Sequence, residues 1–296
     1  MKLLNESLNI DFLGKRNIAW IISSVLIVIS IASLATRGLN LGIDFTGGTL
    51  VEVGYQQAAE LEPIRAALES ASFEDAIVQH FGTAKDVLIR LPAASSTNAA
   101  ELSNQVLDAL ESTGELSMRR VEFVGPQVGE ELRDDGGLAV LYALFGILIY
   151  VALRFEYRFS LGSVAALIHD VIVTIGFFSV TQASFDLTVL AAVLAVIGYS
   201  LNDTNVVFDS IRENFRRMSK STPLEVINGS INQTLSRTLM TSLTTLLVLL
   251  ALFFIGGEVI HSFALALIVG VVVGTYSSIY IASSMLMTLN VTAQDL

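Results

Sequence analysis

Long apolar stretches recur along the chain and predict membrane-spanning helices, because a helix that crosses a bilayer needs about 20 largely apolar residues. Six stretches of the sequence approach this length. We expect the spans at residues 18–36, 138–153, 161–181, 187–208, 237–255 and 262–289. The stretch 138–153 is the shortest, but Gly136 and Gly137 before it can extend it. The pattern predicts a multi-pass α-helical membrane protein with six transmembrane helices.

Residues 37–137, between the first two spans, show a different pattern in which strand-like and helix-like periods alternate. Strand-like alternation occurs at residues 49–55, 76–81, 87–91 and 119–123, and helical spacing at residues 60–71 and 98–110. The predicted order is strand, helix, strand, strand, helix, strand. This order is typical of an α+β domain with the ferredoxin-like, split βαβ arrangement.

The composition excludes several classes of protein. Only 15% of the residues are charged and the mean hydropathy is +0.66, whereas a soluble domain has roughly 25% charged residues. The absence of cysteine excludes disulfides, thiolate zinc sites and cysteine nucleophiles. The three histidines lie far apart, and no glycine-rich phosphate loop of the Walker type occurs. We therefore expect no enzyme activity, no metal site and no bound cofactor.

The net charge of −11 is concentrated in residues 37–137, which contain 17 acidic and 7 basic residues. A domain of this sign does not attract nucleic acid. The surplus of acidic residues either keeps the domain soluble or forms a weak binding face for an unfolded chain. The pattern leaves both interpretations open.

The distribution of basic residues predicts the orientation in the membrane. Basic residues cluster near Lys15, near Arg154 and around Arg212, always between alternate pairs of spans. The short loops on the opposite side, at residues 182–186 and 256–261, contain no lysine or arginine. Because basic residues are enriched in cytoplasmic loops, both termini are predicted to be cytoplasmic.

The cytoplasmic parts predicted in this way are the N-terminal residues 1–17, the loop 209–236 and the tail 290–296. Residues 37–137 then lie outside the cytoplasm. The first span could alternatively be a cleaved signal peptide, but its 19 uncharged residues exceed the 7–15 apolar residues of a typical signal core. We expect the first span to be retained as a lipid-embedded helix.

Ionisable residues inside the predicted spans are the main candidates for function, because placing a charge at mid-bilayer costs about 2.5 to 3.5 kcal/mol. Asp203 lies 17 residues from Asp186, and Arg237 lies 18 residues from Ile255. At 1.5 Å per residue these separations place both charges about 25 to 27 Å from the outer ends of their helices. Adjacent antiparallel helices could therefore bring the two side chains together.

Other polar residues accompany these charges. Asn202, Thr204 and Asn205 flank Asp203, while His169 and Asp170 lie near the middle of the third span. A hydrogen bond from Asp170 to a neighbouring helix is favoured over a second proton site. For Asp203 and Arg237, placement at the cytoplasmic interface remains an equal alternative to an intramembrane pair.

A carboxylate near an arginine inside a membrane can couple proton movement to helix movement. Desolvation and the neighbouring cation act in opposite directions on its affinity for a proton. Separation and re-formation of the pair would then change its proton occupancy. Protons are the only coupling ion that the sequence predicts.

Four motifs resemble those of the SecD/SecF family of bacterial protein-export membrane proteins, and of its SecF members in particular. They occupy residues 42–48, 124–129, 198–204 and 208–214. The signature residues in the first two are Asp44, Phe45, Thr46, Gly47, Gly48, Gly125 and Pro126. The order of one span, a large outer domain and five further spans also agrees with this family.

The resemblance implies a function and a set of partners. Such proteins form half of an assembly of the resistance-nodulation-division (RND) superfamily in the bacterial inner membrane, with a periplasmic domain corresponding to residues 37–137. SecD supplies the other half, and YajC, the SecYEG channel and the preprotein are further partners. The family uses the proton-motive force to assist late steps of preprotein export, after the SecA motor has acted. By motif, Asp203 and Arg237 correspond to the residues that transfer protons.

Two other functions remain open at this point. The chain could be a scaffold of the translocon that conducts no protons. It could also be a self-associating exporter of small molecules or lipids from the same superfamily. Gly270 and Gly274 in the last span predict close helix packing, without indicating whether the neighbouring helix belongs to the same chain.

Overall fold

The computed structural model describes residues 9–92, 99–218 and 221–292. The chain divides into two compact units. A helical unit consists of Met1–Asn40 and Leu138–Leu296, and an α+β unit consists of Leu41–Gly137. The α+β unit begins four residues after the start predicted at residue 37 and ends at the predicted residue 137.

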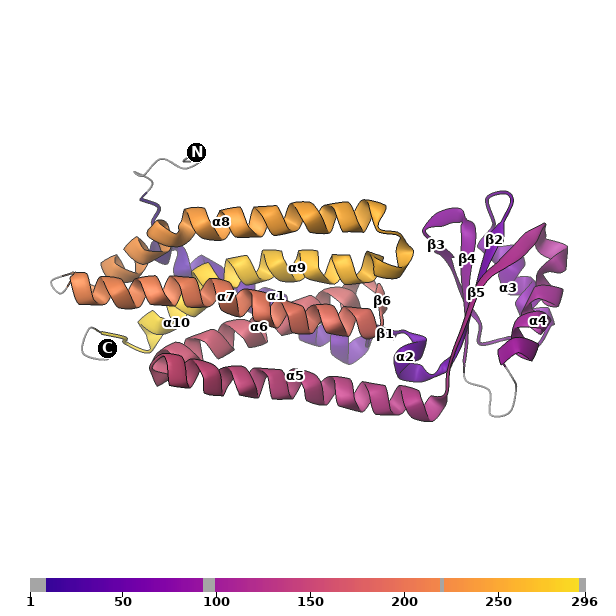
Figure 1. The fold of residues 1–296 in the computed structure, drawn as a ribbon, viewed down its shortest axis with the longest axis horizontal. Coiled ribbons are helices and arrows are strands. Elements are labelled where there is room, and N and C mark those ends of the chain that lie inside the picture. Colours follow the sequence, from indigo (N-terminus) through magenta and orange to yellow (C-terminus); the bar gives the residue numbers. More distant parts are fainter. Residues whose placement is uncertain (1–8, 93–98, 219–220, 293–296) are drawn as a thin grey trace. The chain divides into compact units, whose positions relative to one another are not determined.

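Six helical segments of the described residues are long and apolar enough to cross a membrane (Figure 1). They are formed by α1 (Arg16–Thr36), α5 (Pro126–Arg154), α6 (Tyr157–Thr181), α7 (Leu187–Arg217), α8 (Pro223–Ile255) and α9 (His261–Ser277), the last continued by the π-helical turn η4 (Ser278–Ala282) and by α10 (Ser283–Thr288). Short elements flank them: η1 (Leu13–Lys15), η3 (Glu258–Ile260) and the strands β1 (Asn40–Leu41) and β6 (Ser184–Phe185). The predicted fold class, a six-helix membrane protein, is confirmed.

The segment 209–236 was expected to be a loop, but most of it is helical. Helix α7 continues to Arg217, and α8 begins at Pro223. Hydropathy marks where a span becomes polar, whereas a helix ends only at a capping signal. The signal here is Thr222, whose side chain accepts a hydrogen bond from the backbone of Glu225 while the Glu225 side chain accepts one from the Thr222 backbone.

The polar start of α8 also holds the N-terminal segment. Asn228 accepts hydrogen bonds from the backbone amide of Phe12 at 2.9 Å and donates one to the carbonyl of Ile10 at 3.0 Å. Asn232 accepts from the Ile10 amide and donates to its carbonyl, both at 2.9 Å. The chain before α1 and the connection between α7 and α8 therefore lie at the same end of the helical unit.

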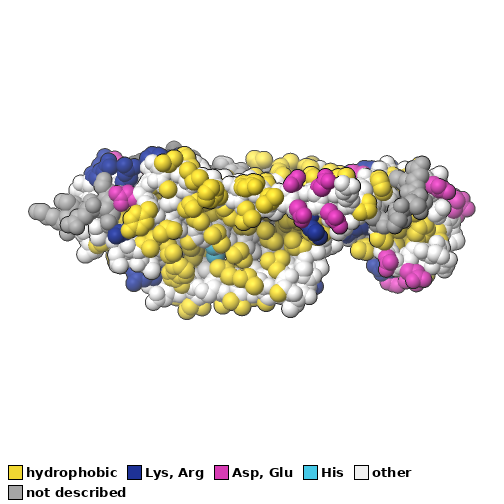
Figure 2. All heavy atoms as spheres, turned by 90° about the horizontal axis from the view of Figure 1, so that it is seen from below, with side chains coloured by type: hydrophobic (Ala, Val, Ile, Leu, Met, Phe, Trp, Pro, Cys, Tyr) yellow, Lys and Arg dark blue, Asp and Glu magenta, His cyan; other side chains and the backbone are white. Residues whose placement is uncertain are grey.

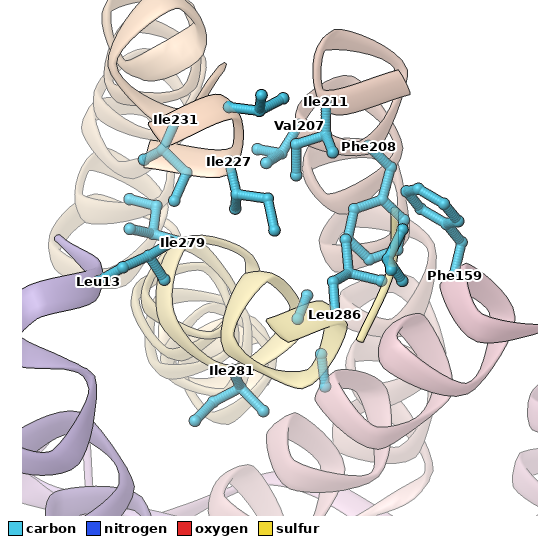
Figure 3. Packing of buried hydrophobic residues seen from close by; sticks show 14 of the residues in the cluster. Leu13, Phe159, Val207, Phe208, Ile211, Ile227, Ile231, Ile279, Ile281 and Leu286 are labelled. Atoms are coloured by element: carbon cyan, nitrogen blue, oxygen red, sulfur yellow. The ribbon is translucent and has the colours of Figure 1, made fainter. Parts of the chain in front are cut away.

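A hydrophobic core joins the helices near this end (Figure 3). Phe159 of α6 and Phe208 of α7 are fully buried and meet edge to face, with ring centroids 5.1 Å apart. Isoleucines of α7, α8 and η4 complete the cluster, namely Ile211, Ile227, Ile231, Ile279 and Ile281. This packing holds α6, α7, α8 and the last helix in one unit.

The outer faces of the helical unit remain apolar and exposed. Leu153 is 85% exposed, Ile255 83% and Phe254 76%. On the face shown in Figure 2, hydrophobic side chains cover much of the helices, while lysine and arginine side chains gather at one end. A soluble protein does not expose so much apolar surface, which indicates contact with lipid or with another membrane protein.

The α+β unit contains the element order that the sequence predicts. Its elements are α2 (Ile43–Thr46), β2 (Gly48–Tyr55), α3 (Leu61–Ser70), β3 (Ile77–Phe81), β4 (Thr83–Leu91), α4 (Ala99–Leu110), η2 (Glu111–Thr113) and β5 (Leu116–Val124). The sheet order is β3-β4-β2-β5, and all neighbouring strands are antiparallel. Alternate residues of β2, such as Val51 and Val53, pack with Ile64 and Leu68 of α3 and Val106 of α4.

Candidate intramembrane site

Asp203 is buried in α7, close to α8. Its side chain is 3% exposed, and Oδ2 has no hydrogen-bond partner. Ser242 of α8 is the hydroxyl within hydrogen-bonding reach of this carboxylate. The Ser242 hydroxyl also forms hydrogen bonds with the hydroxyls of Thr275 on α9, at 2.7 Å, and of Tyr199, at 3.3 Å. The carboxylate therefore belongs to a polar cluster shared by three helices.

Arg237 interacts electrostatically with Asp203 without a direct contact between the two side chains. The arginine side chain is exposed, and no nitrogen–oxygen distance within 4.0 Å joins these two described residues. Depth and rotation are separate properties of a helix. Five residues separate Arg237 from Ser242, which is about 140° around the helix axis and about 7.5 Å along it. The serine, which is buried, lies on the side of α8 that approaches Asp203.

Several buried polar atoms around Asp203 lack protein partners. The hydroxyls of Thr204 and Thr238 and the side-chain oxygen of Asn205 are buried and unpaired. Asn202, in contrast, is exposed. Since buried polar atoms normally have partners, these positions are suited to bound water. The sequence correctly indicated a polar region here, but it did not identify Thr238.

Asp170 and His169 form a second polar cluster. The Asp170 side chain is fully buried, and its Oδ2 accepts hydrogen bonds from Ser200 of α7 at 2.5 Å and Ser277 of α9 at 2.7 Å. Its Oδ1 lies 3.0 Å from Nδ1 of His169. The prediction that Asp170 hydrogen-bonds to a neighbouring helix is therefore confirmed.

The hydroxyl residues that complete these clusters were not predicted from the sequence. Ser200, Ser242, Thr275 and Ser277 lie within apolar stretches, where isolated serine and threonine residues are common. Their signal is weak because a helical serine can satisfy itself with the carbonyl four residues earlier. Only the helix packing shows that Ser200, Ser242 and Ser277 lie beside carboxylates and that Thr275 contacts Ser242.

The family signature residues form a separate feature within the α+β unit. Gly47 has φ +67° and ψ 169°, and a Cβ there would lie 2.8 Å from the Cα of Pro126. A Cβ on Gly129 would lie 2.6 Å from the Gly47 nitrogen. The two motifs, which are about 80 residues apart in sequence, therefore pack backbone against backbone. The remaining signature residues are Asp44, Phe45 and Thr46 in α2, Gly48 in β2, and Gly125 before α5.

Among the described residues, no group of three or more histidine, cysteine, aspartate or glutamate side chains could hold a metal ion. The two polar clusters contain only hydroxyls, amides, an imidazole, carboxylates and one nearby guanidinium. This set of groups can bind water and exchange protons.

Comparison with known families identifies the chain. A model described as "Protein export membrane protein SecD/SecF, C-terminal" matches residues 105–292, and a model of the SecD/SecF GG motif matches residues 32–59. The chain belongs to the SecD/SecF family. This result confirms the family predicted from the motifs.

Similar proteins include curated SecF subunits over nearly their whole length. The chain is 51% identical to protein translocase subunit SecF of Vibrio alginolyticus, covering 100% of this chain and 94% of that protein. It is 52% identical to the subunit of the same name in Pseudomonas aeruginosa, covering 97% and 94%.

Solved SecDF structures share the fold. The crystal structure of SecDF from Thermus thermophilus matches with a TM-score of 0.89 and 38% identity, over 97% of this chain and 40% of that one. A SecDF structure in the super-membrane-facing form matches with a TM-score of 0.73 and 39% identity, over 98% and 40%. The chain spans about two fifths of the length of these SecDF chains.

Proposed function

We propose that this chain is the SecF subunit of a SecDF complex in the bacterial inner membrane, and that inward proton movement through the complex assists late steps of preprotein translocation. The similarity to SecF subunits over 94% of their length supports the assignment. SecDF chains contain one further part, about three fifths of their length, that has no counterpart here. That part corresponds to the SecD partner of our proposal.

The observation that carries the proposal is the buried Asp203 carboxylate with one unpaired oxygen. An ionisable group deep in a membrane helix is expensive, so its retention there needs a functional reason. Arg237 on the neighbouring helix acts on the carboxylate through its charge. A shift of α8 relative to α7 would change that interaction and with it the proton occupancy of Asp203. Protons are thus the coupling ion, and no other cofactor enters the proposal.

The proposed orientation follows from the charges and from the contacts at one end of the helical unit. Arg212, Arg216 and Arg217 lie at the end where the N-terminal segment contacts the start of α8. Basic residues mark the cytoplasmic side. Both termini are then cytoplasmic, residues 37–137 form the periplasmic domain, and SecYEG, YajC and the preprotein are further partners.

The proposal is tested by Asp203→Asn, which keeps the size of the side chain and removes its charge. We expect membrane insertion and assembly with SecD to be retained, while the part of preprotein export that depends on the proton gradient is lost in inverted vesicles. The loss should be on the order of 100-fold, as for removal of a proton-transfer group.

The matched control is Asp209→Asn on the same helix, because Asp209 is exposed and forms a surface ion pair with Arg154 at 3.2 Å. Surface pairs contribute little, so export should be unchanged. Normal gradient-dependent export by Asp203→Asn in an intact complex would reject proton transfer and leave the scaffold function.

A further inference from the structure

We infer that His169 and Asp170 form a second proton-holding site, which exchanges protons with Asp203 through the hydroxyl of Ser200. The inference rests on the proposed function. The argument depends on the burial of the pair, on its partners and on its position along the helices.

The partners of Asp170 let the pair carry no net charge when it holds one proton. Asp170 is fully buried, and its side-chain partners are two serine hydroxyls and His169. No lysine or arginine of the described chain forms an ion pair with it. An isolated buried carboxylate is costly, but a carboxylate and an imidazole that hold one proton between them carry no net charge. The proton can reside on either group without changing the total charge of the site.

His169 has a free position through which a proton can enter or leave. Its Nδ1 faces Asp170, while Nε2 is buried with no hydrogen-bond partner. The other titratable group that faces the His169 ring is Tyr276 of α9, and the two ring centroids lie 6.2 Å apart. The Tyr276 hydroxyl donates a hydrogen bond to the carbonyl of Ala19. An imidazole with one nitrogen bound and the other available is suited to pass a proton on.

Buried polar groups continue from the pair toward the connection between α6 and α7. The Thr174 hydroxyl, one helical turn from Asp170 in that direction, is buried and has no partner. Further along, the Ser179 hydroxyl meets Ser33 of α1 at 2.8 Å and the carbonyl of Gly38 at 2.7 Å. These groups form a row of polar positions along the contact between α1 and α6.

The order of depths fits a path that ends at Asp203. Asp170 lies 11 residues from Thr181 at the end of α6, or about 16 Å. Ser200 and Asp203 lie 13 and 16 residues from Leu187 at the start of α7, or about 20 and 24 Å. Since α6 and α7 meet at this end, the three residues follow one another in depth.

Ser200 can connect the two carboxylates. Its hydroxyl donates to Asp170 at 2.5 Å, and residues three apart lie on the same face of a helix, so Ser200 and Asp203 are neighbours on α7. In the transfer, the hydroxyl first turns its hydrogen from Asp170 toward Asp203. Its oxygen then accepts the proton of the Asp170 carboxyl while its former hydrogen passes to Asp203. The hydroxyl again points toward Asp170, and one proton has moved from one carboxylate to the other.

A purely structural role would also explain some of these contacts, because the cluster ties α6 to α7 and α9. Two serines separate the explanations. Ser200 and Ser277 donate to the same oxygen of Asp170, at 2.5 and 2.7 Å, and both are fully buried. Only Ser200 lies one turn from Asp203 on the same helix. Loss of either hydroxyl weakens the cluster, but only loss of Ser200 interrupts the proposed path.

The test measures proton flux and export with the complete SecDF complex in vesicles, using a pH-sensitive dye. Asp170→Asn should reduce gradient-driven flux by about tenfold or more. Ser200→Ala should reduce it by about the same factor, and Ser277→Ala by clearly less. His169→Gln, which cannot titrate, should change the pH profile of the flux, an effect that a packing defect does not produce.

Asp203→Asn in the same assay separates this inference from the proposed function. If Asp203→Asn abolishes flux while Asp170→Asn and His169→Gln retain it, the second site is rejected and the proposed function stands. If Asp203→Asn also leaves the flux unchanged, the proposed function itself fails. Equal losses in Ser200→Ala and Ser277→Ala would reject the relay. If Asp170→Asn does not assemble, an unchanged pH profile of His169→Gln rejects the site.

Discussion

Single small residues determine how closely α7 and α9 approach one another. A Cβ added to Gly270 would lie 2.1 Å from a methyl carbon of Val196 on α7, and one added to Gly274 would lie 3.1 Å from the Cβ of Ser200. The G-x-x-x-G pattern therefore packs against a helix of the same chain. This close packing brings Ser277 near Asp170 and Thr275 near Ser242.

Gly270→Ala should destabilise the helical unit, because the stiff Val196 side chain cannot move aside without separating the two helices. We expect a loss of about 1 to 3 kcal/mol, as for other overpacked sites. Thermal unfolding of the purified protein in detergent measures it. Gly198→Ala on α7 is the control, because a Cβ there meets no atom within 4 Å. Equal unfolding temperatures for the two variants would contradict the close approach.

The intramembrane residues show what a sequence can predict at this scale. Counting residues predicts one common level for Asp203 and Arg237. The α8 residue found close to Asp203 is instead Ser242, five residues and about 7.5 Å farther along the helix. The facing side chains could not be predicted, because they depend on the axial offset and rotation of each helix, which are decided by the packing of residues such as Val196 and Gly270.

At the scale of elements, the junction between α2 and β2 depends on the backbone of Gly47. Its φ and ψ, +67° and 169°, lie in a region that is essentially open only to glycine. The neighbouring backbone of Pro126 leaves no room for a side chain. The start of α5 and the end of α2 therefore hold each other in place.

Gly47→Ala should loosen this junction by about 2 kcal/mol or more, from backbone strain and overlap together. Hydrogen exchange of the whole protein should then show faster exchange at the first residues of β2 and the last residues of β5, which pair at Gly48 and Val124. Gly125→Ala is the control, since a Cβ there meets no atom within 4 Å. Identical exchange in both variants would show that the close contact is not needed.

The elements themselves were predictable to different degrees. Periodicity placed β2 and α4 within one residue of their observed bounds, because their apolar faces pack on a single core. Strand β4 begins four residues earlier than predicted, at Thr83, because Thr83–Asp86 is polar and carries no alternation. The polar ends of α7 and α8 were missed for the same reason: hydropathy reports burial in lipid, and these turns are helical outside it.

At the scale of the whole molecule, the absence of cysteine makes the orientation directly testable. Gln57 is exposed in the α+β unit, and Met218 is exposed at the end of α7. In cells with a permeabilised outer membrane, an impermeant maleimide should label Gln57→Cys. It should label Met218→Cys only after the inner membrane is broken. The opposite pattern would invert the proposed orientation.

The exposed apolar faces predict a partner in the membrane. Helices α1, α5 and α8 are the least buried of the six spans within the chain, and SecDF chains contain a further part beyond the two fifths matched here. A tagged copy of this chain, purified from native membranes in mild detergent, should therefore carry SecD in a 1:1 ratio. Recovery of a homodimer without SecD would favour the self-associating exporter. Asp203 and the His169–Asp170 pair both lie within this chain. A second experiment therefore tests whether proton transfer requires groups from another subunit. Proton flux in vesicles that contain this chain alone would show that its own residues complete the path.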